Sequence, residues 1–211
     1  CDFLSGPAGE KEKEEYVKML VDEIRNCPDT VQNYRVISIF FGGGTPSLLT
    51  GEQIGRLMDT VREIFTLDED AEITMEMNPG TVTEEKLRKY RQAGVNRLSI
   101  GLQSVNDEEL RLLGRIHTYE EFREAYHLAR ANGFSNINVD LISAIPGQTV
   151  ESWRRTLEQV MALSPEHISA YSLILEEGTT FYKKYVEDEA KEGPSFRMRM
   201  RSVRCTGIRK R

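Results

Sequence analysis

The chain has 211 residues, of which 39% are hydrophobic and 29% charged, and its formal net charge at pH 7 is −6. This composition excludes collagen-like and low-complexity chains and supplies enough apolar side chains for one buried core. No run reaches the roughly 18–20 apolar residues of a membrane span, and no signal segment opens the chain, so we expect a soluble, non-secreted protein. The three cysteines, Cys1, Cys27 and Cys205, are too few for a disulfide framework and favour a reducing cytoplasm.

Charge is unevenly distributed along the chain. Residues 195–211 carry seven basic side chains and no acidic one, although the chain as a whole is acidic. An acidic body gives no electrostatic reason to expect nucleic acid as a ligand. The basic tail has three interpretations, which are an arm that binds RNA or lipid, a solvated end, or a frame-shifted terminus.

Short β-branched runs alternate with amphipathic stretches in chain order. The pattern predicts helices near 16–24, 54–65, 83–93, 118–133 and 153–163, and a short helical stretch at 180–190. It predicts strands at 36–41, 71–77, 97–102, 137–145 and 167–175. Thr50 with Gln53, and Thr118 with Glu121, have the spacing of capping boxes, and Gly94 is suited to a left-handed helix cap.

The alternation of strands and helices with short connections predicts an α/β fold of parallel strands joined by right-handed crossovers. A closed eight-unit barrel usually takes about 250 residues, so we expect either an incomplete barrel or an open sheet. We find no second domain and no internal repeat beyond this alternation.

In parallel α/β folds, chemistry collects at the carboxyl ends of the strands. The first such end carries Gly42, Gly43 and Gly44, followed by Thr45. Three glycines remove every Cβ, so the backbone can approach a ligand closely and offer its N–H groups. The same turn is also compatible with a tight connection alone, and it has neither the dinucleotide-binding pattern nor the lysine of a P-loop.

Polar residues also mark the later strand ends. Glu76 precedes Asn-Pro, which favours a place at the barrel mouth over a solvated carboxylate. Asp140 lies in an apolar strand and needs a partner, either Arg115 or a hydroxyl or amine of a ligand, because an unpaired buried carboxylate is costly. Gln103 and Arg115 have simpler alternatives as a structural amide and a surface cation. The three histidines are too dispersed to suggest a metal site.

Seven ordered motifs carry a resemblance to a known family. They are FGGGTPS at 41–47, EMNPG at 76–80, LSIGLQS at 98–104, LGRIH at 113–117, NVDLI at 138–142, IPGQT at 145–149 and EEGTTF at 176–181. Together they closely resemble the radical S-adenosylmethionine family that holds the oxygen-independent coproporphyrinogen III oxidases and the related heme chaperones. The resemblance implies a partial parallel (β/α) barrel over 1–193, with 194–211 as a basic tail outside the family pattern.

The resemblance also gives the first residue a role. The family binds a [4Fe–4S] cluster with Cys-x3-Cys-x2-Cys, and in the chaperone branch Asp-Phe follows the last cysteine. Cys1 is followed by Asp2 and Phe3, so it resembles that third thiolate ligand, although without the family it would be an ordinary free thiol. Two cluster cysteines and the family's C-terminal domain are missing from the sequence, so we expect a fragment that does not hold the cluster by itself.

The family's cofactor contacts transfer to matching positions of this chain. The residues implied to bind S-adenosylmethionine are Gly42, Gly43, Gly44, Thr45, Glu76, Gln103, Arg115 and Asp140. The glycine turn and Thr45 would contact the methionyl end, with Glu76 beside it. Arg115 and Asp140 are also a plausible ion pair, and strand 167–175 would supply backbone contacts on the adenine side.

The expected chemistry follows from the family's cofactors. A reduced cluster donates one electron to the sulfonium and releases methionine and a 5′-deoxyadenosyl radical. In the oxidase branch this radical abstracts hydrogen from a propionate, which then decarboxylates to a vinyl group. The chaperone branch instead binds heme and delivers it to recipient proteins.

Asp-Phe after the last cysteine and the LGRIH motif favour the chaperone branch. This branch implies heme or porphyrin, an electron donor and a heme-recipient protein as partners. The oxidase is the alternative within the family. A barrel that binds the cofactor without redox chemistry is the alternative of another class, so whether this chain is an enzyme stays open. An aldolase-like enzyme would need a Schiff-base lysine at a strand end, and we find none.

Overall fold

The computed structural model describes residues 6–187. Two predictions fall outside this range, namely Cys1 as a cluster ligand and 194–211 as a separate tail. None of the described helices combines the length and apolar character that a bilayer crossing requires.

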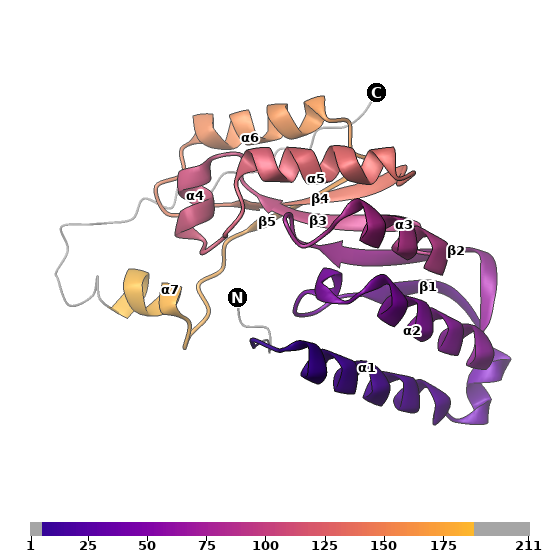
Figure 1. The fold of residues 1–211 in the computed structure, drawn as a ribbon. Helices are drawn as coiled ribbons and strands as arrows, with labels where there is room; N and C mark the ends of the chain where they lie inside the picture. The colour runs from indigo at the N-terminus through magenta and orange to yellow at the C-terminus, as the bar shows by residue number, and fades with distance from the viewer. Residues whose placement is uncertain (1–5, 188–211) are drawn as a thin grey trace.

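Five parallel strands form one sheet in the order β1-β2-β3-β4-β5. They are β1 (Arg35–Phe41), β2 (Thr66–Met77), β3 (Arg97–Gln103), β4 (Asn136–Ser143) and β5 (His167–Ser172). Figure 1 shows the helices that connect successive strands on one side of this curved sheet, as expected when successive strands are neighbours and every crossover has the same hand. The predicted α/β fold is confirmed as a half-barrel of five parallel strands.

The helices begin and end close to where their sequence signals stand. They are α1 (Glu10–Arg25), α2 (Gly51–Ile64), α3 (Glu84–Ala93), α4 (Asp107–Leu112), α5 (Tyr119–Ala131), α6 (Val150–Ala162) and α7 (Thr180–Tyr182), which a π-helical turn (Lys183–Glu187) follows. Both capping boxes are confirmed. The side-chain oxygens of Thr50 and Thr118 each accept the backbone N–H three residues on, and their own backbone N–H groups donate to the side chains of Gln53 and Glu121. Gly94 caps α3 with φ +107°.

One helix and three strand boundaries differ from the sequence prediction. Helix α4 was not predicted, because six residues are too few to show a helical period. Strand β4 stops at Ser143, since Ala144 has φ +58° and leaves the extended region. Strand β5 stops at Ser172, and β2 begins early, at Thr66, because its first residues pair with the start of β1.

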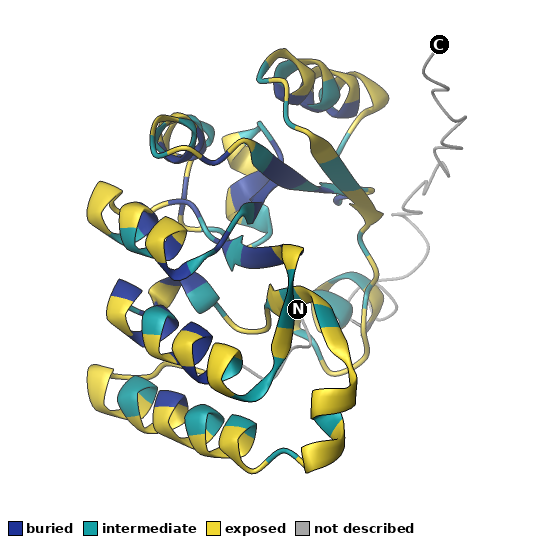
Figure 2. Cartoon of the chain, turned by 90° about the vertical axis from the view of Figure 1, so that its right-hand side faces the viewer, coloured by how far each residue is buried: buried dark blue, intermediate teal, exposed yellow. Residues whose placement is uncertain are grey.

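The two faces of the sheet differ in character. Leu98, Ile100 and Leu102 alternate along β3 and are fully buried against the helices. Burying an aliphatic side chain of this size contributes about 1.5–3 kcal/mol. Figure 2 shows the buried residues concentrated where the helices meet the strands. Ser99 lies between two of them in sequence, and Gln103 follows the last. Both therefore face the concave side of the half-barrel, which is polar.

Candidate functional site

The glycine turn after β1 lies beside the end of β2. The backbone N–H of Gly43 donates to Oε2 of Glu76 at 3.1 Å, and this is the only side-chain hydrogen bond that Glu76 makes within the described residues. Gly43 and Gly44 have φ values of +78° and +59°, and a Cβ on either would meet no atom within 4 Å. Glycine is therefore required here by backbone conformation, and the turn leaves open space around itself.

Thr45 continues the turn and is held from the next strand end. Nδ2 of Asn78 donates to Oγ1 of Thr45 at 3.3 Å, while its backbone N–H donates to Oγ of Ser47 at 3.3 Å. Ser47 is fully buried and also bonds Thr81 at 2.6 Å. Asn78 thus ties the ends of β1 and β2 together.

Asn78 also faces the end of β3. A Cβ on Gly101 would lie 3.0 Å from Nε2 of Gln103 and 3.3 Å from Oδ1 of Asn78, so only glycine lets these amides approach. Gln103 is 7% exposed, has φ +78°, and lies where the register between β3 and β4 shifts. The irregular strand end turns its amide towards the site instead of continuing the sheet.

Arg115 follows α4 and reaches the same place. Its Nη1 donates to Oδ1 of Asn78 at 3.5 Å, which is its only side-chain hydrogen bond within the described residues. Burial lowers the pKa of Arg115, and the charge of Asp140 opposes that effect only in part. A partly buried guanidinium with a single long hydrogen bond has most of its five donors free for an anion.

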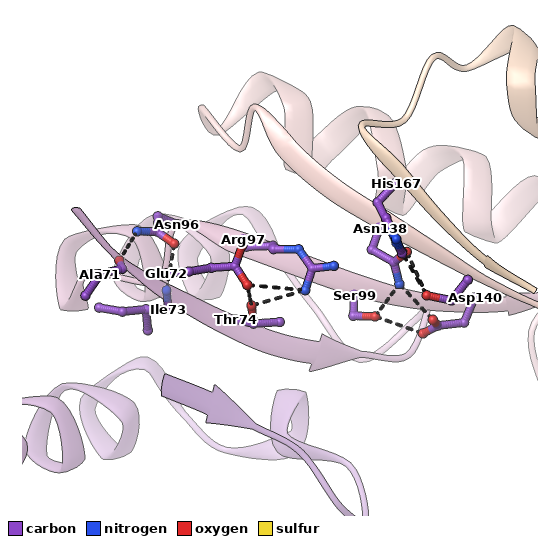
Figure 3. Close-up of polar contacts among 11 residues, drawn as sticks. Ala71, Glu72, Ile73, Thr74, Asn96, Arg97, Ser99, Asn138, Asp140 and His167 are labelled. Atoms are coloured by element: carbon purple, nitrogen blue, oxygen red, sulfur yellow. Dashed lines mark hydrogen bonds and ion pairs between the residues drawn. The ribbon is translucent and has the colours of Figure 1, made fainter. Parts of the chain in front are cut away.

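Asp140 is held by hydrogen bonds from its own strand, β4, and from the neighbouring strand β3. Oγ of Ser99 donates to Oδ2 of Asp140 at 2.9 Å, and Nδ2 of Asn138 donates to Oδ1 at 2.7 Å. Figure 3 shows Asn138 between Asp140 and Ser99 on one side and His167 on the other. The amide oxygen of Asn138 accepts from Oγ of Ser169 at 3.0 Å and from Nδ1 of His167, which must therefore carry a proton.

One alternative for Asp140 was an ion pair with Arg115. That prediction is wrong, because no ion pair joins the two side chains within the described range. Ser99 and Asn138 already occupy both oxygens of the carboxylate, and Arg115 turns towards Asn78 instead. The two charges are near enough to affect each other but not in contact.

All the predicted site residues except Cys1 lie within the described range, at the carboxyl ends of β1 to β4. The register places Glu76 opposite Ser99, and Gly101 opposite Asp140, so the polar positions form neighbouring rows on the concave face. Sequence reasoning missed Ser99 and Asn138 as partners of Asp140. The signal that could have revealed them was the alternation of polar side chains along β3 and β4. No group of three or more possible metal-ligating side chains gathers anywhere in residues 6–187.

Comparison with known proteins gives the family of this chain. Residues 1–160 match the profile of the Radical SAM superfamily, and the chain therefore belongs to that superfamily. It is 44% identical over 182 residues to "Heme chaperone HemW" of Escherichia coli, which covers 86% of this chain and 48% of that protein. It is 36% identical over 184 residues to "Radical S-adenosyl methionine domain-containing protein 1, mitochondrial" of Danio rerio, covering 87% and 41%.

Solved structures agree on the fold. The chain matches coproporphyrinogen III oxidase (HemN) from Escherichia coli with a TM-score of 0.76 and 34% identity, over 83% of this chain and 41% of that one. Elp3 of Methanocaldococcus infernus matches with a TM-score of 0.62 at 18% identity, which shows the shared fold alone. The chain spans about half the length, or less, of the relatives named here.

Proposed function

We propose that the strand ends of this half-barrel bind S-adenosylmethionine and that the protein functions as a heme chaperone. The observation that carries the proposal is the 44% identity to the Escherichia coli heme chaperone over 182 residues. Membership of the radical SAM superfamily implies a [4Fe–4S] cluster and S-adenosylmethionine as cofactors. The remaining question is whether the residues at the site suit them.

The charges at the strand ends suit the cofactor's amino-acid end. Arg115 has free donors for a carboxylate, which planar guanidinium groups bind with two parallel hydrogen bonds. Glu76 keeps one carboxylate oxygen without a hydrogen bond from the described residues, and that oxygen can accept from an ammonium group. The open backbone at Gly43 and Gly44 leaves room between them.

The other half of the site suits a sugar and a base. Each carboxylate oxygen of Asp140 accepts one hydrogen bond from the protein, so each retains acceptor capacity for a ribose hydroxyl. The buried amide of Gln103 adds a donor and an acceptor beside it. Bound together, cluster and cofactor supply reductive cleavage of the sulfonium to a carbon-centred radical. We assign Cys1 as one thiolate ligand of that cluster.

The heme-chaperone branch is favoured over the oxidase by sequence similarity. Identity is 44% to the chaperone and 34% to the oxidase of the same organism, in alignments that each cover more than four-fifths of this chain. A chaperone function also requires heme, an electron donor and a heme-accepting protein as partners, in the cytoplasm. The oxidase is the second candidate, which the TM-score of 0.76 to HemN supports.

One experiment separates the two activities. The protein is expressed from its complete reading frame, reconstituted anaerobically with iron and sulfide, and titrated with heme. We expect a shifted heme absorption band and transfer of the heme to an apo-hemoprotein. A parallel anaerobic incubation with coproporphyrinogen III, S-adenosylmethionine and a reductant should leave the propionates intact. Decarboxylated product would contradict the chaperone proposal in favour of the oxidase, and S-adenosylmethionine binding without heme binding would favour a cofactor-binding module.

A further inference from the structure

Glu109 is a buried carboxylate that the proposed cofactor contacts do not use. It lies on α4 and is 6% exposed. Within the described residues no lysine, arginine or histidine forms an ion pair with it, so only hydrogen bonds compensate its burial. A buried carboxylate is retained at little cost only where such donors converge on it.

Three side chains from two distant segments donate to this carboxylate. Oε2 accepts from Oγ of Ser104 at 2.6 Å and from Nε2 of Gln148 at 2.8 Å. Oε1 accepts from Oγ of Ser152, in the first turn of α6. Glu109 therefore joins the loop after β3, the loop after β4 and the start of α6 to one helix.

The loop after β3 leads directly to a proposed cofactor contact. Ser104 is covalently next to Gln103, whose left-handed backbone must be held against its own preference. Oγ of Ser104 also accepts the backbone N–H of Asn106, the N-cap residue of α4. Fixing the Ser104 side chain therefore fixes both the irregular strand end and the start of the helix.

Helix α4 and the loop after β4 connect Glu109 to two more of the proposed cofactor contacts, Arg115 and Asp140. Helix α4 ends just before Arg115, whose backbone N–H donates to the carbonyl of Leu110 at 2.9 Å. The loop after β4 folds back through the backbone N–H of Gln148, which donates to the carbonyl of Ile145 at 2.9 Å. That loop follows the strand that carries Asp140.

We propose that Glu109 is a positioning residue for the cofactor site, because it fixes Gln103, Arg115 and the loop after β4 in one arrangement. The role rests on the proposed binding of S-adenosylmethionine. Glu109 itself touches none of the proposed cofactor contacts, and it acts only through Ser104, Gln148 and Ser152.

Glu109→Gln tests this role with almost no change in side-chain shape. One carboxylate oxygen becomes an NH2 group, which can only donate. In place of Oε2 it would face the donating amide of Gln148, and in place of Oε1 it would face Ser152, whose hydroxyl would have to turn and accept. Either arrangement breaks or reverses a native hydrogen bond, and a buried donor left unpaired costs the desolvation of that group. Glu108→Gln is the matched control, since Glu108 is the preceding residue on the same helix and is exposed.

The test uses the protein expressed from its complete reading frame and reconstituted with its cluster. We expect Glu109→Gln to raise the dissociation constant of S-adenosylmethionine by about tenfold, the lower end of the effect of removing partners that orient ligand-contacting groups. Hydrogen exchange should become faster in 103–106 and 145–149 and stay unchanged in 35–41. Glu108→Gln should change neither measurement.

A rescue separates positioning from a general loss of stability. Adding Gln148→Glu to Glu109→Gln restores one donor and one acceptor across the same contact, and we expect it to recover most of the cofactor affinity. Should Glu109→Gln fail to fold, Gln148→Leu removes a single donor and should still weaken binding severalfold. Wild-type affinity in a folded Glu109→Gln or Gln148→Leu protein would overturn the positioning role. A wild-type protein that does not bind S-adenosylmethionine counts instead against the proposed function.

Discussion

The two halves of the strand-end site are built in different ways. At the ends of β1 and β2, the exposed glycine turn is held by single hydrogen bonds, from Gly43 to Glu76 and from Asn78 to Thr45. At the ends of β3 and β4, Gln103 and Ser104 are buried, and Glu109 gathers three donors behind them. One half is an open backbone, and the other is a network of side chains.

The two halves therefore differ in how far they are ordered before a ligand binds. Buried hydrogen bonds to a charged group fix the second half in advance, because leaving any member unpaired is costly. The glycine turn has no comparable contacts, and ordering it costs backbone entropy that a bound ligand has to offset. Changes in the network should therefore reduce stability more than changes in the turn do.

Asn138→Leu should have the largest effect on stability. Asn138 is 2% exposed and makes four hydrogen bonds, so its removal leaves Ser99, Asp140, Ser169 and His167 each without one partner. We expect the free energy of unfolding to fall by about 3 kcal/mol. Chemical denaturation measures this, with Ser143→Ala on the same strand as a milder control, because Ser143 is only partly buried and its hydroxyl bonds the carbonyl of Tyr171 and Oγ of Ser172. A loss below 1 kcal/mol would show that the network contributes little to the free energy of unfolding.

Gly44→Ala should have a smaller effect, through backbone conformation alone. Its added Cβ meets no atom within 4 Å, but φ is +59°. An L-residue in this region costs about 1–2 kcal/mol. Gly55→Ala is the matched control, because Gly55 also has open space but lies inside α2. There alanine should stabilise the protein by about 0.5–1 kcal/mol, and equal effects of both substitutions would contradict this explanation.

His117 should give the smallest effect, which appears only as pH changes. It is 6% exposed and bonds the carbonyl of Leu102, and burial lowers its pKa. The unfolded chain therefore binds a proton at a higher pH than the folded one does, so stability falls as pH drops below about 6.5. His117→Gln should flatten the slope of unfolding free energy between pH 7 and pH 5. The exposed His127→Gln should retain it, and an unchanged slope in His117→Gln would be contrary to our expectation.

Much of the fold could be predicted because its signals are local. Short β-branched runs marked the strands, and Thr50 and Thr118 marked helix starts through contacts only three residues away. Helix α4 could not be predicted, since six residues carry no period and one of its two buried residues, Glu109 and Leu110, is charged in type.

The sequence indicated which polar residues gather near the strand ends, but not how they pair. Gly43 and Glu76 were expected together and are joined by a hydrogen bond. Arg115 and Asp140 were expected to pair, but the sheet register brings Ser99 to Asp140 first. That register depends on long-range packing, which no short motif encodes.

Binding of S-adenosylmethionine to Arg115→Gln is the most direct measurement of whether these strand ends form the cofactor site. Calorimetric titration of the reconstituted protein should show a dissociation constant raised by about tenfold or more, because a charge-assisted pair with the cofactor's carboxylate is lost. Arg111→Gln, on the exposed side of α4, should bind like the wild type. Equal affinity of the Arg115→Gln and wild-type proteins would contradict the proposed site.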